Sequence, residues 1–228
     1  MYKVLKRALD LLISGFTFLL LSPLFLVIAI LLKITAEGHV FYFQKRIGYM
    51  SVPFDIWKFA TMLKDSPNMG TGMITLRNDP RVTTVGRFLR KSKLNEMPQI
   101  INVMKGDMSI VGPRPLVMKT YMAIPEAIRE QVYMSKPGVT GVGSIVFRDE
   151  ELLISNAEEP PQELYDKWIA PYKGDLEIWY LNNKSMWVDI KVIFLTAWAI
   201  LFPSNNLVYK ILKDLPEPPE GLRTQKNN

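Results

Sequence analysis

An uncharged apolar run near the amino terminus constrains the fold of this chain more than any other feature. Residues 11–32 contain no charged side chain, and a helix of about 20 apolar residues is long enough to cross a hydrocarbon core of about 30 Å. The first alternative is a secretory signal peptide, because Lys3, Lys6 and Arg7 precede the run. The run is too long for the apolar part of a signal peptide, and no small-residue cleavage pattern follows it. The sequence therefore predicts a membrane segment that is retained.

Ser22 and Pro23 lie in the middle of this run, where a proline removes one backbone hydrogen bond and kinks a helix. Cations flank the run on both sides, so the charge asymmetry of a simple span is missing. Two half-helices that enter the membrane and return to the same face satisfy both observations, and a proline-kinked span is the alternative. We predict a re-entrant helix–break–helix segment over residues 1–36.

The composition narrows the chemistry. A net charge of +6 and a pI of about 9.4 favour anionic partners: nucleic acid, acidic lipid headgroups or phosphorylated ligands. The absence of cysteine excludes disulfides and thiolate metal sites. With His39 as the single histidine, multi-histidine zinc sites are excluded and a Ser-His-Asp triad is disfavoured. Any catalysis must rest on carboxylates, arginine, lysine and a cation such as Mg²⁺.

The rest of the chain predicts an α+β fold, mostly helical with one short β-hairpin. Residues 40–44 are aromatic and β-branched, and residues 54–59 alternate apolar with polar side chains, with turn residues between the two. The polar residues 64–80 predict a loop that is a candidate lid. Residues 136–144 are rich in glycine but lack the spacing of a nucleotide-binding loop.

A second uncharged patch, residues 192–203, is too short to cross a bilayer. Trp187 and Trp198 accompany it, which favours an amphipathic helix at the membrane interface, and a buried core helix is the alternative. We assign residues 37–215 to a cytoplasmic domain with interfacial helices. Residues 216–228, rich in proline, glutamate and lysine, predict a flexible tail.

The densest group of candidate functional residues lies in residues 93–115. It contains Asn95 and Glu96, a Gly-Asp turn, and the stiff sequence Gly112-Pro113-Arg114-Pro115. Cations beside a carboxylate and a proline-stiffened loop suit a metal-assisted site for a phosphorylated substrate. The alternative is a salt-bridged helix face followed by an ordinary turn.

Together these residues resemble the small monotopic phosphoglycosyl transferases, a bacterial sugar transferase family. The resemblance covers nearly the whole chain and is most specific in residues 94–115. Its other parts are Lys6-Arg7-x-x-Asp10, Ser22-Pro23, Phe43-Gln44-x-Arg46-x-Gly48, Asp79-Pro80-Arg81-Val82-Thr83 and Lys136-Pro137-Gly138-x-Thr140-Gly141.

The resemblance implies a reaction at the cytoplasmic face of the bacterial inner membrane. A UDP-sugar donates its phosphosugar to polyprenol phosphate, which gives polyprenol-diphosphosugar and UMP, with Mg²⁺ as cofactor. In the family an Asp-Glu pair acts, and the Asp attacks the β-phosphate to form a covalent intermediate. The implied partners are the UDP-sugar, polyprenol phosphate and the lipid bilayer; no nucleic-acid motif is present, and homo-oligomerisation stays open.

Carried onto this chain, the resemblance assigns catalysis and metal binding to Glu96 and Asn95. The residues assigned to phosphate or substrate binding are Lys58, Arg81, Arg90, Arg114 and Pro113. For the four cations, surface salt-bridging is the alternative role.

The chain departs from the family pattern at two positions. Asn95 stands where the family has its nucleophilic Asp, and Ala60 stands where the family has an arginine in a Lys-Phe-Arg strand. A carboxamide is a poor nucleophile and a weaker Mg²⁺ ligand than a carboxylate. Three readings follow: Glu96 replaces the nucleophile, transfer is direct, or the protein is an inactive homologue that serves as a membrane scaffold or ligand-binding protein. An engineered substitution would explain only Asn95, so the two departures together favour a natural variant.

Overall fold

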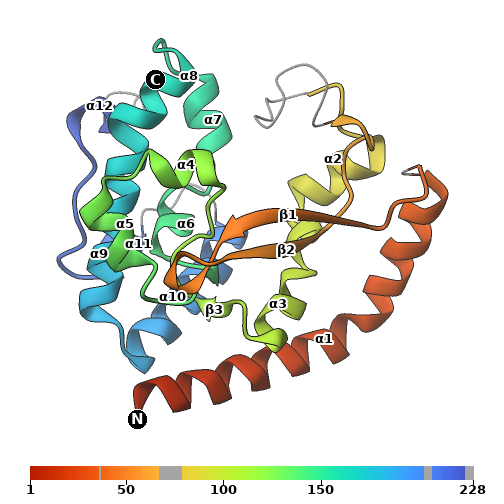
Figure 1. Cartoon of the computed structure of the whole chain (residues 1–228), viewed down its shortest axis with the longest axis horizontal. Coiled ribbons are helices and arrows are strands. Elements are labelled where there is room, and N and C mark those ends of the chain that lie inside the picture. Colours follow the sequence, from red (N-terminus) through yellow and green to blue (C-terminus); the bar gives the residue numbers. More distant parts are fainter. Residues whose placement is uncertain (36, 67–78, 203–206, 224–228) are drawn as a thin grey trace.

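The computed structural model describes residues 1–35, 37–66, 79–202 and 207–223. In these ranges the chain is mostly helical, with two small sheets near its centre (Figure 1), which confirms the predicted α+β class. The elements are α1 (Tyr2–Thr35), β1 (Phe41–Ile47), β2 (Pro53–Phe59), α2 (Thr84–Lys91), α3 (Gln99–Lys105), β3 (Ser109–Val111), α4 (Met118–Met122), α5 (Glu126–Val132), β4 (Gly138–Thr140), α6 (Val142–Val146), α7 (Glu150–Ser155), α8 (Pro161–Leu164), α9 (Ala170–Asn183), α10 (Met186–Leu201), α11 (Leu207–Ile211) and α12 (Glu220–Arg223). Short 3-10 turns η1 (Tyr49–Ser51) and η3 (Leu94–Glu96) and a π-helical turn η4 (Tyr165–Ile169) join them.

Strands β1 and β2 form the predicted antiparallel hairpin, with Phe41 opposite Phe59. Aromatic pairs stabilise it across the strands: the rings of Phe43 and Trp57 meet edge to face with centroids 4.8 Å apart. Ile56 and Phe59 are buried on opposite faces of β2, because side chains three apart on a strand point to opposite sides. Lys58 shares the face of Ile56, and both line the central cleft described below.

Strands β3 and β4 form a two-stranded parallel sheet in which Ser109 pairs with Gly138. The segment that follows β3 folds back against the start of β4, since Gly138 N donates to the Pro113 carbonyl at 2.8 Å. A side chain on Gly112 would collide with the Lys136 carbonyl, so glycine permits this close approach. The glycine-rich stretch is thus a strand packed against residues 112–113.

Helix α1 is long and apolar enough to cross a membrane, and only 11% of its most apolar window is buried. This exposure indicates membrane association. The break predicted at Ser22 and Pro23 is not a break: one helix passes through both residues and curves across the base and right side of Figure 1. Pro23 cannot donate to the Leu19 carbonyl, and Ser22 Oγ donates to that carbonyl at 2.8 Å instead. The lost bond is therefore replaced locally.

The first third of α1 is fixed to the domain by polar contacts. Arg7 donates to the carbonyls of Val103 and Met104, at 2.6 and 3.0 Å, at the end of α3. The buried Asp10 carboxylate accepts from Ile110 N at 2.9 Å. These cations and carboxylates of α1 lie against protein, so this third of the helix is part of the domain.

The last third of α1 is fixed to the same domain by apolar contacts. Ile28 and Leu32 are buried in a cluster with Phe59 of β2 and Leu89 of α2. The Phe25 ring lies against Phe59 with centroids 5.3 Å apart. Both ends of α1 are consequently attached to one body.

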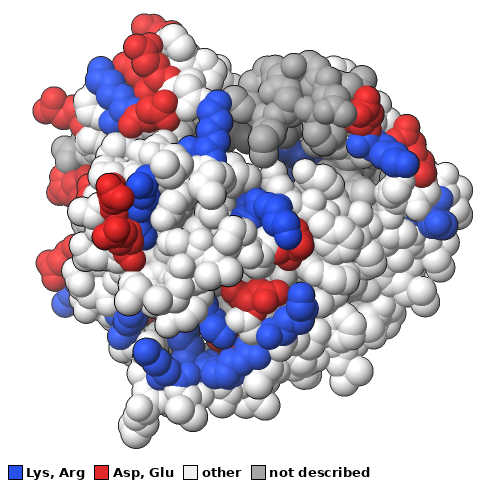
Figure 2. All heavy atoms as spheres, in the orientation of Figure 1, with Lys and Arg blue, Asp and Glu red and all other residues white. Residues whose placement is uncertain are grey.

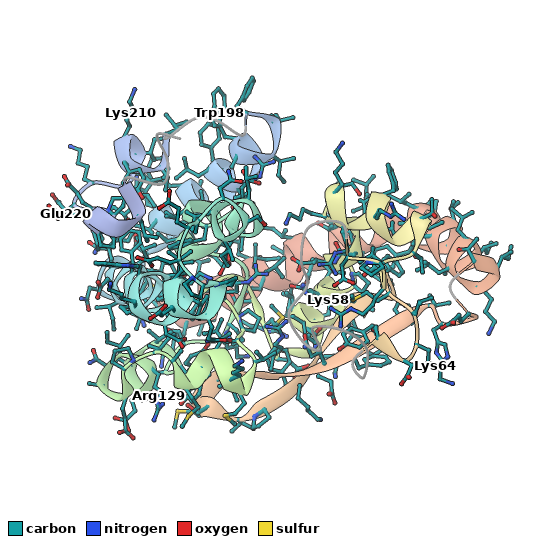
Figure 3. All side chains as sticks on the ribbon, turned by 90° about the horizontal axis from the view of Figure 1, so that it is seen from above. Lys58, Lys64, Arg129, Trp198, Lys210 and Glu220 are labelled. Carbon is teal, nitrogen blue, oxygen red and sulfur yellow. The ribbon has the colours of Figure 1, made fainter. Side chains whose placement is uncertain are left out.

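The main core lies between α9 and α10 and the short helices around them. Helix α10 runs from Met186 to Leu201, so it begins before the predicted patch, and one of its sides is buried as the core-helix alternative requires. Val192 and Leu195 are buried in the core, whereas Phe194 and Ile200 are exposed on its other side. Figure 3 places Trp198 on α10 at the edge of the molecule.

The packed part of the chain extends beyond the boundary predicted at residue 215. Leu215 and Leu222 are buried, and α12 lies so close to Trp168 that a side chain on Gly221 would meet its ring at 2.5 Å. Apolar side chains within the proline- and glutamate-rich stretch therefore hold residues 216–223 against the core. Residues 224–228 lie outside the described part.

Candidate active site

The position of Glu96 is fixed by the elements on either side of it. Thr83 caps α2, since its Oγ1 accepts from Gly86 N at 2.9 Å, and η3 then carries Glu96 to the start of α3. Asn102 of α3 accepts from Trp57 N at 3.0 Å and donates to the Asp55 carbonyl at 2.8 Å. This side chain fixes α3 to β2, and Glu96 thereby faces Lys58 of β2.

Glu96 is the centre of a cluster of charges. Lys58 Nζ lies 2.7 Å from Glu96 Oε1, and Arg114 Nη2 lies 3.8 Å from the same oxygen. The side chains of Lys58, Glu96 and Arg114 are 16%, 25% and 43% exposed. Figure 3 shows Lys58 in the interior, between the hairpin and the helices, whereas Lys64, Lys210 and Glu220 lie at the periphery. The structure thus brings together three of the predicted site residues from distant parts of the chain.

Cations dominate the electrostatics of this cluster. Burial alone would raise the pKa of Glu96, but Lys58 and Arg114 together lower that pKa well below its usual value. Burial lowers the pKa of Lys58, and the charge of Glu96 opposes this effect. Burial and the neighbouring Arg114 lower the pKa of Arg46 to about 10. One ionised carboxylate among three cations leaves a positive surplus that favours a multiply charged anion.

The cluster closes a narrow cleft with an internal volume of about 10 Å³. Such a volume holds about one water molecule, so a diphosphate can enter only if side chains move. Arg114 is the most exposed of the charged groups around Glu96. The cleft is lined by Arg46, Ile56, Lys58, Glu96, Gln99, Arg114, Pro115, Gly138 and Val139.

Asn95 contributes an oxygen without a partner. Its Oδ1 atom is buried and accepts no hydrogen bond within the described part of the chain. A buried acceptor left unpaired costs about 1–3 kcal/mol, so the position is unfavourable unless something binds there. Both ion-pair contacts of Glu96 use Oε1. Among the described residues, its Oε2 atom makes no hydrogen bond or ion pair.

These two oxygens fit a magnesium site that the substrate completes. The described residues contain no group of three or more His, Cys, Asp or Glu side chains that could hold a metal by themselves. Mg²⁺ is usually held by one or two protein carboxylates and completes its shell with substrate phosphates and water. Glu96 Oε2 and Asn95 Oδ1 suit that arrangement, in which the substrate supplies the remaining ligands.

The other predicted site residues lie outside the Glu96 cluster. Arg81 is buried and donates to both carboxylate oxygens of Asp79, at 2.9 and 2.6 Å, and to the Ser66 carbonyl at 2.9 Å. Arg90 lies half-buried in the last turn of α2, and the cations that act most on the pKa of Glu96 are Lys58, Arg114 and Lys93. Pro113 is buried, and its carbonyl fixes the loop to β4.

Sequence reasoning missed Arg46 and Gln99 as lining residues. Arg46 donates to Gln44 Oε1 at 2.7 and 3.0 Å and to the Pro115 carbonyl at 3.2 Å. Residues two apart on a strand share a face, so the spacing of Gln44 and Arg46 could have predicted that their side chains meet. Gln99 follows Pro98 in the first turn of α3 and is buried, and no local pattern marks it.

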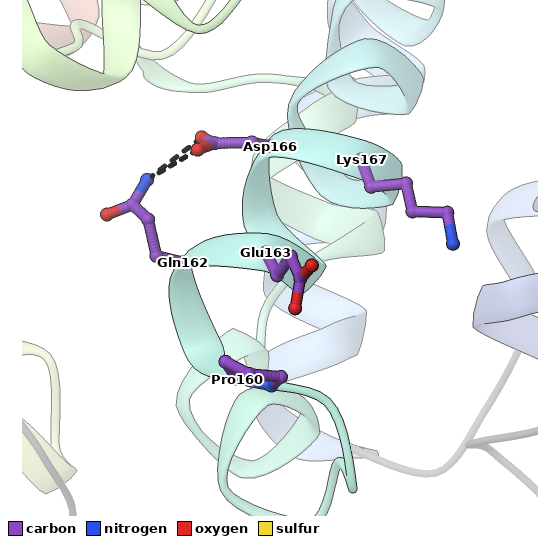
Figure 4. Close-up of a pocket in the computed structure, with 5 residues that line it drawn as sticks. All are labelled: Pro160, Gln162, Glu163, Asp166 and Lys167. Atoms are coloured by element: carbon purple, nitrogen blue, oxygen red, sulfur yellow. Dashed lines mark hydrogen bonds between the residues drawn. The ribbon is translucent and has the colours of Figure 1, made fainter.

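Two surface features lie away from this cleft. Figure 2 shows Lys and Arg side chains gathered along the lower edge of the molecule, over the amino-terminal part of α1 and over β3. A shallow, open depression lies on α8 and η4 and is lined by Pro160, Gln162, Glu163, Asp166 and Lys167 (Figure 4). Gln162 Nε2 donates to both Asp166 oxygens at 2.9 Å, and the depression has no counterpart to the buried charges around Glu96.

A matched pair of lysines tests the energetics of the cluster. Lys58→Met should lower the free energy of unfolding at pH 7 by about 3 kcal/mol, because it leaves a partly buried carboxylate without its nearest partner. Lys45→Met removes the same 2.7 Å contact, with Asp55, from side chains that are 71% and 46% exposed, and should cost about 0–1 kcal/mol. Urea unfolding in detergent measures both, and equal costs would contradict the assigned role of burial.

The same comparison has a defined pH dependence. The folded-state pKa of Glu96 lies below its usual value of 4.5, so its stabilising contribution is complete above about pH 4.5 and is lost as the pH falls towards the folded-state pKa. The cost of Lys58→Met should therefore shrink below pH 4.5. A cost that is constant from pH 7 to pH 3 would show that the lysine acts through packing alone.

Comparison with known proteins identifies the class. The sequence profile described as bacterial sugar transferase matches residues 1–203, and the chain belongs to the bacterial sugar transferase family. It is 36% identical over 205 residues to an undecaprenyl-phosphate glucose phosphotransferase of Komagataeibacter xylinus, covering 88% of this chain and 36% of that protein. It is 37% identical over 201 residues to a UDP-glucose:undecaprenyl-phosphate glucose-1-phosphate transferase of Escherichia coli K12, covering 86% and 40%.

A shorter relative matches along most of its own length. The chain is 32% identical over 209 residues to the exopolysaccharide production protein ExoY of Rhizobium meliloti, covering 86% of this chain and 84% of that protein. The chain thus spans about two fifths of the first two relatives but most of the third. These matches confirm the family resemblance drawn from residues 94–115.

Proposed function

We propose that this chain transfers a phosphosugar from a UDP-sugar to a polyprenol phosphate, as the first membrane step in the assembly of a glycan. The products are a polyprenol-diphosphosugar and UMP. The observation that carries the proposal is the Glu96 carboxylate, which lies among the cations Lys58, Arg46 and Arg114. The relatives support the choice of substrates, because their names specify undecaprenyl phosphate and UDP-glucose.

The residues of the cleft divide the chemistry among them. Lys58, Arg46 and Arg114 bind the donor diphosphate and offset its charge. Glu96 and Asn95 hold Mg²⁺, which when bound neutralises further charge on the diphosphate. The Asn95 carboxamide is neutral, and Glu96 is held by two cations, so both are weak nucleophiles. Transfer is therefore direct: an acceptor phosphate oxygen forms a bond to the donor β-phosphorus, and the bond from that phosphorus to the bridging oxygen breaks to release UMP.

The test of this function is UMP release from a panel of UDP-sugars by purified protein with Mg²⁺ and undecaprenyl phosphate. We expect release that requires the lipid acceptor and stops when EDTA removes the cation. Release that is indifferent to the acceptor would indicate hydrolysis. No release from any donor by folded protein would overturn the proposal and favour the scaffold reading.

The attachment of both ends of α1 to one domain supports a re-entrant placement of the membrane segment. A helix that crossed the bilayer would carry its two ends to opposite faces, yet Arg7 and Leu32 both contact the same compact body. The exposed middle of α1 lies in the lipid while both of its ends stay with the domain, on the cytoplasmic face. The exposed apolar side of α10 lies at the interface, and the basic surface in Figure 2 lies near acidic headgroups.

Thiol labelling tests this topology, since the chain has no cysteine. Lys3→Cys and His39→Cys place exposed single thiols in the first turn of α1 and after its last residue. We expect a membrane-impermeant maleimide to label both in inside-out vesicles and neither in spheroplasts. Leu19→Cys, in the middle of the helix, should be labelled in neither preparation. Labelling of positions 3 and 39 from opposite sides would show a spanning helix instead.

A further inference from the structure

Glu177 of α9 is a buried carboxyl group outside the cleft. It is 6% exposed, and glutamate is rarely so buried without a partner. Helix α9 runs beside the segment that leads from β3 to Arg114, because Tyr180, one turn further along α9, donates to the Val111 carbonyl at 3.4 Å. Glu177 and Tyr180 therefore lie on the face of α9 that meets this segment.

The backbone N–H groups of Arg114 and Gly143 face the Glu177 carboxyl and, by hydrogen bonding, oppose the rise in its pKa that burial causes. Pro113 and Pro115 flank Arg114, and proline has no N–H. The Arg114 amide is consequently the only backbone donor in residues 113–115. Glu177 uses this single donor, so it fixes the loop at the residue whose side chain enters the charge cluster.

The backbone around Glu177 leaves space for its carboxyl group. A side chain on Gly143 would meet Glu177 Oε1 at 2.7 Å, so this position requires glycine. A side chain on Gly141 would collide with the Gly112 carbonyl. The loop before Arg114, the start of α6 and Glu177 therefore pack as one unit.

No nearby group fully compensates the buried carboxyl. Lys173 lies one turn earlier on α9, but its Nζ is paired with Glu150, at 2.7 and 2.8 Å. Burial raises the pKa of Glu177 to about 8, although the Arg114 and Gly143 N–H groups and Lys173 act to lower it. Its Oε2 is buried without a hydrogen-bond partner in the described residues. Such an arrangement costs stability, which calls for an explanation other than folding.

We propose that Glu177 is a positioning residue that holds the backbone of Arg114 so that its guanidinium reaches the donor diphosphate beside Glu96. The inference rests on the proposed function. The Arg114 side chain is 43% exposed and stays 3.8 Å from Glu96, so its head can move while its backbone is fixed. When the Arg114 backbone is already fixed, less of the loop has to become ordered as the donor binds. Loss of the Glu177 contact should therefore weaken donor binding more than it slows the chemical step.

Two substitutions at this position separate the hydrogen bond from the charge. Glu177→Gln keeps an acceptor oxygen, and Glu177→Leu removes it at similar size. In the full chain, Glu177→Leu should accelerate amide hydrogen exchange at Arg114 and Gly143 and raise the KM for the UDP-sugar about tenfold, with a smaller change in kcat. Glu177→Gln should retain both properties within about threefold of wild type.

Leu176→Ala is the control for general destabilisation. Leu176 is fully buried on the same helix and belongs to the main core, so this variant should lower the Tm while the exchange at Arg114 and the KM stay as in wild type. A KM raised equally by Leu176→Ala would attribute the effect to stability and overturn the inference. Wild-type exchange and KM in Glu177→Leu would also overturn it.

Failure of the inference and failure of the proposed function give different results. If the wild-type protein released no UMP from any donor, the proposed function would fall, and a role of Glu177 in donor binding would fall with it. Amide exchange requires no activity, so it would still decide whether Glu177 fixes the Arg114 backbone. If UMP release were normal but Glu177→Leu changed neither exchange nor KM, only the inference would fail.

Discussion

Glu96→Gln should reduce UMP release by on the order of a thousandfold or more, the largest loss expected from a single substitution in this chain. The substitution keeps the size of the side chain but removes the only carboxylate in the cluster of Lys58, Arg46 and Arg114. The remaining cations would then repel one another, and the carboxylate that we assign to Mg²⁺ would be lost. Initial rates at saturating UDP-sugar and undecaprenyl phosphate measure the effect.

Asp55→Asn is the matched control for this loss. Asp55 is a paired carboxylate on the same hairpin, but it is exposed and bound to Lys45 rather than to the cleft. Its neutralisation should leave the rate within about twofold of wild type, because an exposed ion pair contributes little. A Glu96→Gln enzyme with near-normal turnover and a normal Tm would refute the catalytic assignment of Glu96.

Asn95→Asp should raise UMP release by on the order of a thousandfold and convert direct transfer into a two-step reaction. It restores the Asp for which the family resemblance implies a nucleophilic role. The carboxylate would stand where the buried Asn95 Oδ1 atom has no hydrogen-bond partner, next to Glu96 and its cations. Without lipid acceptor, intact-protein mass spectrometry should show one phosphosugar attached to the variant and none to wild type.

One control and two alternative outcomes define what a result at Asn95 would mean. Asn183→Asp, on the exposed end of α9, should change neither the rate nor the mass. Activity in Asn95→Asp with silence in wild type would indicate an inactive homologue whose fold is intact. Wild-type activity with no adduct in Asn95→Asp would mean that position 95 is not oriented for attack on the β-phosphorus.

Local sequence patterns predicted several elements of the secondary structure, because such patterns depend on neighbouring residues only. The alternation in residues 54–59 predicted β2, and the uncharged run predicted a membrane segment. The predicted break at Ser22 and Pro23 was wrong because a serine hydroxyl binds the carbonyl that proline leaves free. That compensation depends on one side-chain rotamer, which a sequence pattern does not specify.

The candidate site was predictable where the family motif is contiguous and unpredictable where partners come from distant segments. Residues 93–115 identified Glu96 and Arg114, and the family resemblance assigned Lys58, which the structure places beside Glu96. The structure adds Arg46, to which the sequence assigned no role. Arg81 was expected to bind phosphate, and that role stays a prediction; in the structure its side chain donates to the carboxylate two residues before it. Glu177 carries no signal of its own, since its contacts are with the backbone of residues far away in sequence.

Helix α3 links the site to the apolar helix α1. Its last carbonyls bind Arg7 of the membrane helix, and its first residue follows directly after the turn that carries Glu96. A helix of 7 residues is about 10 Å long, so Glu96 lies roughly that far along α3 from the contact with Arg7. In the reaction proposed above, a phosphate attached to a lipid and a nucleotide that arrives from water would meet beside this helix. One short, rigid element would then bring two substrates of opposite solubility to the same site.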